Sequence, residues 1–482
     1  MRNAVAVALA ATLAACSFAP KYERPPAELP QAWRSAPDGT PAPGDRWWRL
    51  FDDPVLDKLV DEALANNQDL AIAVARVDEA RALAGVVASQ QYPSVTGNAG
   101  VDRSRTSTRT DFFFPGVPVY STNYRATLDV YYELDLWGRL RNATAAARAD
   151  LLATEAARDT VQIALASEVV RSYSALRAFD EQLAATQRAL ELRTNALEIE
   201  RSRAAAGLIS ELDVRQLEGE VAAARALLPA LERARAAEEG AAAVLLGRSP
   251  RAIIDETIAR ASGPDTREPA VVVPPGLPSE LLLRRPDLFE AEQRLLAANA
   301  RIGVARAAFF PQISLTGYLG TEAGSLSNLF TGPAGIWRVA AGLTQPIFQG
   351  GRLFAETEAV EARQRQFVAQ YQKTIQNAFR EVRDAISAQA RAREVYAAEG
   401  ARVEAQREAL KLASARYRAG LVNLLVPIDA ERRLLDAELN RIDALRVQRA
   451  AVADLVRALG GGWTAPEDPA GTSAAPDRQA AR

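Results

Sequence analysis

The sequence contains no histidine, and Cys16 is its single cysteine. These absences exclude imidazole general bases, paired Cys–His nucleophiles, internal disulfides and metal cages built from histidine or cysteine. There is also no phosphate-binding loop, no G-x-S-x-G elbow and no dinucleotide fingerprint where a strand would meet a helix. The sequence therefore argues against an enzyme and against a bound metal or other cofactor.

The chain also lacks an excess of charge of one sign and a long apolar run. Its formal net charge is −2 over 482 residues, and its arginines are scattered among acidic residues instead of forming basic blocks. We therefore expect no nucleic-acid partner. The apolar stretch from Ala4 to Leu13 is too short to cross a bilayer as a helix.

That stretch has the length of a signal-peptide core. It ends in "LAAC", which resembles the lipobox of bacterial lipoproteins and makes Cys16 the first residue of the mature chain. We predict a signal peptide at 1–15, a covalent lipid on Cys16 and a lipidated N-terminal segment at 16–53. Ser17 follows, in place of the aspartate that retains lipoproteins in the inner membrane. An ordinary cleaved signal that contains a cysteine is the alternative.

The remainder of the chain reads as two copies of one unit. "NNQDL", which ends at Leu70, is echoed by "RRPDL", which ends at Leu288, 218 positions later. The Ala-Gly-Leu stretches around Gly207 and Gly420 are 213 positions apart, so the first copy has extra residues in the segment between. We place the copies at 54–248 and 279–461, with an equatorial linker at 249–278 and a tail at 462–482.

Each copy contains a very long stretch with almost no helix-breaking residues. Residues 140–206 lack glycine and proline, and residues 352–419 contain only Gly400. Each helix would be about 100 Å long, which requires packing like that of a coiled coil. A seam at alternating spacings of three and four supports such packing: Leu176, Phe179, Leu183, Leu190 and Leu197. By themselves, these helices fit a plain structural coiled coil.

The segments between the helices have the period of β-strands. From Tyr124 to Asp135, apolar residues alternate with mostly charged or polar ones, which predicts a strand with two different faces. Residues 336–345 repeat the pattern, and partner strands would complete hairpins at about 94–136 and 312–347. Such strands suit a transmembrane barrel, with a soluble β-sandwich layer as the alternative. Four strands cannot close a barrel, so two or three chains would share it.

Together these features resemble the TolC-like outer-membrane efflux channels, especially the lipidated branch that works with resistance–nodulation–division pumps. The resemblance rests on the lipobox at Cys16, the duplicated helix–hairpin–helix unit, the two Ala-Gly-Leu turns, and "ELDLWGRLR" at 133–141, "RRPDL" at 284–288 and "FFPQISL" at 309–315. It implies a mostly α fold with a β-barrel portion. A homotrimer would form a 12-stranded barrel in the outer membrane and a long α-helical tunnel in the periplasm.

The resemblance also implies roles for the two Ala-Gly-Leu turns. They would be the periplasmic tips that receive a periplasmic adaptor, through Gly207, Leu208, Ser210, Leu212, Gly420, Leu421 and Val422. Turn formation alone would also explain both glycines. Ser210 and Asp213 have the spacing of a capping box, and Asn423 is the expected cap of the second return helix.

By the same resemblance, Leu425, Asp429 and Arg432 would ring the aperture of the tunnel. Leu425 would form an apolar constriction, and copies of Asp429 would attract cations. The spacing of Asp429 and Arg432 equally fits a simple ion pair within one helix. Pro427 is expected to bend this helix inward. In the hairpin loop of the first copy, Phe112–Phe114 are expected to pack at the outer mouth of the trimer or at its lipid rim.

The predicted function is a passive outer-membrane channel of a tripartite efflux system. It would conduct small toxic compounds or drugs to the exterior, with a periplasmic adaptor and an inner-membrane pump as partners, and Cys16 would attach it to outer-membrane lipid. Export of proteins or peptides by the same architecture is the first alternative. A periplasmic coiled-coil adaptor or scaffold without a pore is the second, although the lipoyl-like module of an adaptor is not seen.

Overall fold

The computed structural model describes residues 18–31, 33, 44–109, 114, 116, 118–255, 257–261 and 281–465. Cys16, Phe112 and Phe113 lie outside these residues, so the statements about them stay predictions. The elements in chain order are η1 (Trp47–Phe51), α2 (Pro54–Asn66), α3 (Gln68–Ser89), β1 (Ser94–Arg105), β2 (Tyr120–Leu134), α4 (Arg139–Ala205), α5 (Glu211–Leu245), α6 (Pro250–Asp255), α7 (Leu281–Arg284), α8 (Pro286–Ala307), β3 (Gln312–Ala323), η3 (Leu326–Asn328), η4 (Gly332–Ala334), β4 (Gly335–Thr344), α9 (Arg352–Arg418) and α10 (Leu425–Ala458).

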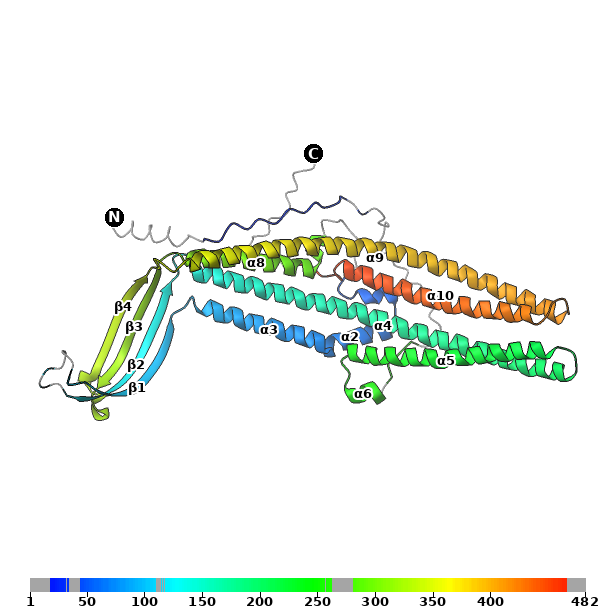
Figure 1. Ribbon diagram of the computed structural model, residues 1–482, viewed down its shortest axis with the longest axis horizontal. Helices are drawn as coiled ribbons and strands as arrows, with labels where there is room; N and C mark the ends of the chain where they lie inside the picture. The colour runs from blue at the N-terminus through cyan, green and yellow to red at the C-terminus, as the bar shows by residue number, and fades with distance from the viewer. Residues whose placement is uncertain are drawn as a thin grey trace. The chain divides into compact units, whose positions relative to one another are not determined.

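The order of elements confirms the predicted duplication. The series α3–β1–β2–α4–α5 is followed by α8–β3–β4–α9–α10 (Figure 1). Helices α4 and α9 each contain 67 residues, and each is therefore about 100 Å long. The chain divides into two compact units. We call residues 1–26, 76–155 and 290–372 the sheet unit, and residues 27–75, 156–289 and 373–482 the hairpin unit.

The sheet unit contains an antiparallel sheet with the strand order β1-β2-β3-β4 (Figure 1). The strand predicted at Tyr124–Asp135 is confirmed as part of β2, in which Leu128 lies opposite Leu319 of β3. Among the described residues, no further strand pairs with β1 or with β4. The sheet of one chain therefore has two open edges, each with unpaired main-chain groups.

The two faces of this sheet differ in polarity. One face exposes large apolar side chains: Val95, Val101, Leu128, Val130, Leu319, Trp337, Val339 and Leu343. Trp337, for example, is 77% exposed. The other face carries polar and charged side chains, as the alternation in the sequence predicts. An apolar surface of this extent indicates a face that is covered by lipid or by another molecule.

The helices of the sheet unit approach one another closely through small residues. Ala146 and Ala149 of α4 pack against Ala297 of α8, and all three are buried. The ion pair between Arg306 and Glu361 joins α8 to α9 at 2.7 Å. Alanine contacts of this kind permit the dense helix packing that the alanine-rich sequence predicts.

The N-terminal residues 18–26 also belong to the sheet unit. The ring of Phe18 stacks on that of Phe310, with centroids 4.3 Å apart. Further along, Arg24 donates two hydrogen bonds of 2.8 Å to the Glu292 carboxylate on α8. The segment that follows the predicted lipid site is thus fixed at two separate points.

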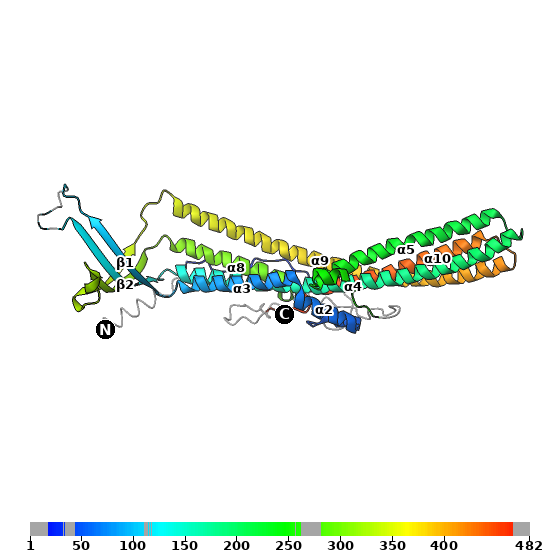
Figure 2. The same ribbon diagram turned by 90° about the horizontal axis from the view of Figure 1, so that it is seen from below.

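The hairpin unit contains two helical hairpins, α4 with α5 and α9 with α10, which lie alongside one another (Figure 2). Of the predicted seam on α4, Leu176 and Leu197 are buried, as are Tyr396 and Val403 on α9. The seam therefore marks the contact face of each hairpin. Within the described ranges, no helix is both long and apolar enough to cross a membrane.

Hydrogen bonds between side chains join the two helices of each hairpin. In the first hairpin, Ser172 donates to Glu238 at 2.5 Å and Arg201 donates to Glu218 at 2.7 Å. In the second hairpin, Arg441 donates to the Tyr396 hydroxyl at 3.3 Å, and Arg407 approaches Glu438 to 3.5 Å. The first hairpin also contains longer contacts, including Arg235 to Asp180 at 3.5 Å, so polar links of varied length join the helices of both hairpins.

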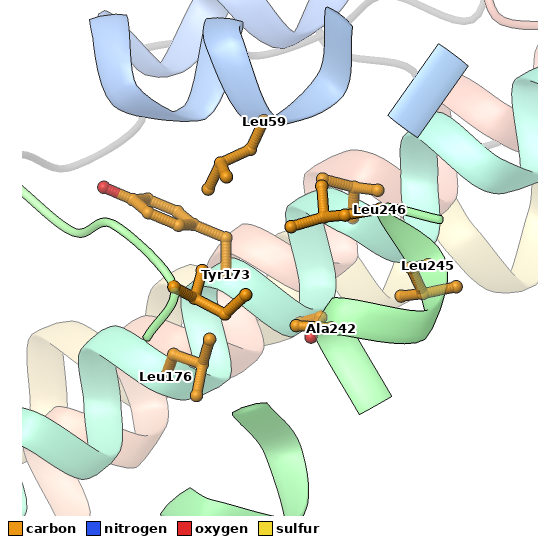
Figure 3. A pocket seen from close by; sticks show the side chains of 9 residues that line it. Leu59, Tyr173, Leu176, Ala242, Leu245 and Leu246 are labelled. Carbon is orange, nitrogen blue, oxygen red and sulfur yellow. The ribbon is translucent and has the colours of Figure 1, made fainter. Parts of the chain in front are cut away.

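A packed core forms where α2, α4 and the end of α5 meet (Figure 3). Leu59, Tyr173, Leu176 and Leu246 are buried there around a cavity of about 10 Å³. That volume holds at most one water molecule. The Tyr173 hydroxyl donates to Asp53 at 2.6 Å, which satisfies the polar end of the ring. This region is therefore a structural core and leaves no room for a ligand.

Candidate functional site

The first turn, residues 206–210, joins α4 to α5. Gly207 has a φ of +73°, a left-handed conformation that costs a residue with a Cβ about 1–2 kcal/mol. The predicted capping box of α5 is confirmed. The Asp213 main-chain N–H donates to the Ser210 hydroxyl at 3.3 Å, and the Ser210 N–H donates to the Asp213 carboxylate at 3.2 Å. Leu208 and Leu212 are exposed at this tip.

The second turn joins α9 to α10 with the same backbone geometry. Gly420 has a φ of +71°, and the Leu421 N–H donates to the Arg416 carbonyl at 2.9 Å. The equivalent leucines of the two turns, Leu208 and Leu421, are 68% and 69% exposed. Both tips therefore present a glycine followed by an exposed leucine.

The start of α10 differs from the prediction. The helix is preceded by Leu424, which has helical φ and ψ angles and makes no side-chain cap. The expectation that Asn423 caps this helix was wrong: Leu424 is the residue that precedes the helix, and its buried aliphatic side chain cannot accept a hydrogen bond from the main chain. Pro427 lies in the first turn, where its missing N–H breaks no helical hydrogen bond. Val422 is half-buried.

An apolar cluster holds the two turns together. Its buried members come from the first hairpin and from the start of α10: Leu197, Val214, Leu217, Val221, Leu424 and Ile428. Ile209 packs against it from the first turn, and Tyr417 packs against it from the end of α9. The first turns of α10 are therefore positioned by the surface of the first hairpin.

A buried arginine adds an ionic link at the same level. Arg193 of α4 has a side chain that is only 4% exposed, and it lies 3.3 Å from Glu220 of α5 and 3.3 Å from Glu431 of α10. Burial raises the pKa of Glu431, Arg193 partly offsets this, and Glu220 adds to it. A charge removed from water in this way needs its partners, so the three groups constrain α10 against the first hairpin.

A second polar contact joins the hairpins nearer the turns. Arg203 of α4 donates to the Tyr417 hydroxyl of α9 at 3.0 Å and lies over its ring at 5.4 Å from the centroid. Burial raises the pKa of Tyr417, and its hydrogen bond with Glu200 raises it further. The tyrosine therefore stays neutral and remains able to donate to that carboxylate.

The predicted aperture residues lie in the first two turns of α10. Leu425 is about half exposed. The Asp429 carboxylate lies 2.7 Å from Arg432 and 2.8 Å from Arg433. The structure thus contains the intrahelical pair that the spacing allows, together with a second arginine that the sequence analysis did not identify. A carboxylate between two guanidinium groups exerts a weakened attraction on cations.

The polar face of the sheet forms a second candidate surface, in the sheet unit. It has a hollow of about 430 Å³ whose lining includes Thr96, Asp129, Tyr131, Tyr318 and Arg338. Asp129 accepts hydrogen bonds from Asn98 at 2.6 Å and from Thr127 at 2.9 Å. These bonds fix charged and polar groups in place on a face with the character of a water-filled lumen.

One further prediction concerns the hairpin loop of the first copy. Of Phe112–Phe114, only Phe114 is described, and it is 64% exposed. Within the described ranges, no group of three or more histidine, cysteine, aspartate or glutamate side chains could hold a metal ion.

Arg193 was not predicted from the sequence, although a signal was present. Arg193 lies three residues after Leu190 and four residues before Leu197, which places it on the seam that was predicted to be buried. A charged residue at such a position needs a buried partner of opposite sign. The identity of that partner, Glu431, depends on how the two hairpins pack and is not encoded by local spacing.

The family model described as outer membrane efflux protein matches residues 59–248 and 277–461. The outer membrane protein OprJ of Pseudomonas aeruginosa is 39% identical over 464 residues, which cover 95% of each chain. The toluene efflux pump outer membrane protein TtgC of Pseudomonas putida is 35% identical over 459 residues, or 94% of this chain and 93% of the relative.

Solved structures of outer-membrane channels resemble this chain over nearly its whole length. The CmeC outer membrane channel of Campylobacter jejuni is 26% identical, with a TM-score of 0.88 over 94% of this chain and 96% of that chain. The open state of the Neisseria gonorrhoeae MtrE outer membrane channel is 32% identical, with a TM-score of 0.83 over 93% of this chain and 98% of that chain.

Proposed function

This chain belongs to the outer membrane efflux protein family and is an outer-membrane channel component of an efflux system, and we propose that three copies of it form one closed pore. The observation that carries the proposal is a four-stranded sheet with two open edges and one exposed apolar face. In a bilayer, unpaired main-chain groups at such edges cost several kcal/mol each. A single copy is therefore incomplete in lipid.

Pairing of β4 of one copy with β1 of the next would remove both edges. Two copies would give about 8 strands, which enclose an interior just wide enough for side chains, whereas three give about 12 and leave an open lumen. An efflux pore requires that lumen, so three copies fit the function. The apolar face with Trp337 and Val339 would contact lipid, and the polar face with Asp129 and Arg338 would line the lumen.

The two tips are the proposed contact with a periplasmic adaptor. The residues assigned to this contact are Gly207, Leu208, Ser210, Leu212, Gly420, Leu421 and Val422. The equal geometry of the two turns supports the assignment, because an adaptor built from repeated hairpins can bind both in the same way. An inner-membrane pump would supply the energy, and the channel itself would be passive.

The aperture is proposed to lie at the start of α10. In a trimer, three copies each of Leu425, Asp429 and Arg432 would surround one axis. The exposed side chain of Leu425 and the arginines that flank Asp429 support a constriction that is partly apolar and partly neutralised.

The cargo class is proposed to be small organic compounds, including toxic solvents and drugs. Support comes from TtgC, a relative named for toluene efflux. The lipid on Cys16 belongs to the same proposal, since it would place residues 18–26 next to the membrane.

The proposal is tested by the number of subunits and by transport. Full-length protein extracted in detergent should have the mass of three chains in native mass spectrometry. A deletion strain should accumulate a fluorescent drug and recover on complementation. A two-chain complex, or a deletion strain with normal drug accumulation and impaired protein secretion, would contradict it.

A further inference from the structure

The two return helices, α5 and α10, each end against the motif near the beginning of their own copy. Gly247 follows α5 and Gly460 follows α10, and both have positive φ angles, +68° and +95°. A Cβ on either glycine would overlap a carbonyl oxygen, that of Asn66 in the first copy and that of Arg284 in the second. "NNQDL" and "RRPDL" therefore have the same structural place: each receives the end of a return helix.

The side chain that caps the helix end differs between the copies. In the first, Asn67 donates from Nδ2 to the Leu245 carbonyl at 2.9 Å. In the second, the equivalent Arg285 donates from Nη1 to the Ala458 carbonyl at 2.8 Å. Because an amide is sufficient for this cap, the arginine has donors available for further contacts.

Arg285 uses those donors to bind two carboxylates. Nε and Nη2 donate to Asp287 at 2.9 Å and 2.7 Å, and Nη2 also donates to Glu381 of α9 at 2.9 Å. Arg285 is 7% exposed, whereas the Glu381 side chain is 40% exposed, so the contact is buried on the side of the arginine and reaches solvent on the side of the glutamate. One side chain thus connects the start of α8, the end of α10 and the interior of α9.

The first copy lacks this link among its described residues. The residue of α4 that corresponds to Glu381 is Glu168, whose carboxylate lies 3.7 Å from Arg171 on the same helix. Asn67 has no charge with which to attract Glu168. The first hairpin has other links between α4 and α5, such as Ser172 to Glu238 at 2.5 Å and Arg193 to Glu220 at 3.3 Å, and none of these involves Asn67.

We propose that Arg285 sets the axial register of α9 against α10, and through it the position of Leu425 and Asp429 at the far end of α10. The part of this proposal that concerns the aperture rests on the proposed function. From Glu381 to the end of α9, and from Ala458 back to Leu425, the helices run about 55 Å and about 50 Å.

A helix is stiff along its axis, so a shift at the anchored end appears at the tip. Arg285 is placed to act in this way because it holds both helices at one level through a single rigid guanidinium group. It would touch no cargo and is a positioning residue. The neutral Asn67 of the first copy donates only to the end of α5.

The test uses full-length protein in detergent and measures hydrogen exchange together with single-channel conductance. Arg285→Asn keeps the copy-one residue type and removes the charge, and Glu381→Gln is the milder variant on an exposed carboxylate. Both should speed exchange of amides 428–436 by about tenfold and broaden the distribution of conductance levels. The matched controls Asn67→Ala and Glu168→Gln should leave amides 428–436 unchanged.

The two measurements distinguish a residue that only caps the end of α10 from one that sets the axial register of α9 against α10. If exchange in both variants rises only at 281–289 and 455–463, Arg285 is a helix cap and the proposal is wrong. If amides 428–436 respond while conductance does not, the register role stands and the aperture lies elsewhere on the chain. If Arg285→Asn unfolds, Glu381→Gln decides the test by itself, because that variant keeps the hydrogen bond from Arg285 to the Ala458 carbonyl.

Discussion

The two helical hairpins have the same turn but begin their return helices in different ways. In the first, the Ser210–Asp213 capping box satisfies the helix start with residues of the turn itself. In the second, Leu424 and Ile428 are buried against the first hairpin, and no side chain caps the helix. The first hairpin is thus self-sufficient, whereas the second depends on its neighbour. The two copies therefore share the backbone turn but differ in the contacts that stabilise the helix start after it.

The largest effect is expected from substituting the glycine of either turn. A bulky residue at Gly207 or Gly420, such as leucine, should abolish efflux because it strains a left-handed backbone and fills the surface where an adaptor would bind. Drug susceptibility of a complemented deletion strain measures this, with trimer yield as the check on folding. Gly219→Leu, in the interior of α5 with open space around it, is the control. Retained resistance in both tip variants would remove the docking role.

The next effect concerns the ionic link on which the second hairpin depends. Arg193→Met should destabilise the protein by about 3–5 kcal/mol, because it leaves Glu220 and Glu431 without their buried counter-charge. Arg201→Met, which breaks an ion pair with Glu218 nearer the surface, should cost less than about 1 kcal/mol. Denaturant unfolding at one fixed protein concentration compares them. Equal losses for the two variants would show that burial of Arg193 is unimportant.

A smaller effect is expected at the proposed aperture. Asp429→Ala should raise single-channel conductance in planar bilayers, on the order of twofold, because it releases Arg432 and Arg433 from a fixed arrangement. Asp436→Ala, further along the same helix, is the control. An unchanged conductance in Asp429→Ala would place the aperture at other residues.

The smallest effect is a dependence on pH. The pKa of Glu431 is raised in the folded protein, so its protonated form is favoured there, and this contribution is lost as pH rises through the folded-state pKa. Wild type should therefore gain stability relative to Glu431→Gln as pH is lowered from 7.5 toward about 4.5. Melting temperatures of both proteins at several pH values measure the difference. A constant difference would mean that Glu431 does not titrate in this range.

Local patterns were enough to predict the elements but not the contacts between them. The alternation in Tyr124–Asp135, the long glycine-poor helices and the capping box are properties of neighbouring residues, and the structure contains all three. Asn423 was misassigned because the burial of Leu424 depends on a hairpin about 200 residues away in sequence. The bonds of Arg193 to Glu431 and of Arg285 to Glu381 depend on tertiary packing in the same way.

The open edges of the sheet have a consequence for cells that make both an intact and a defective version of the chain. A subunit whose edge strands pair with those of its neighbours will assemble with any copy of the chain that is made in the same cell, whether intact or defective. If a cell produces equal amounts of a sound and a defective version, roughly one three-subunit pore in eight would consist of sound chains only. A single damaged allele on a plasmid should therefore suppress resistance in a strain whose chromosomal gene is intact.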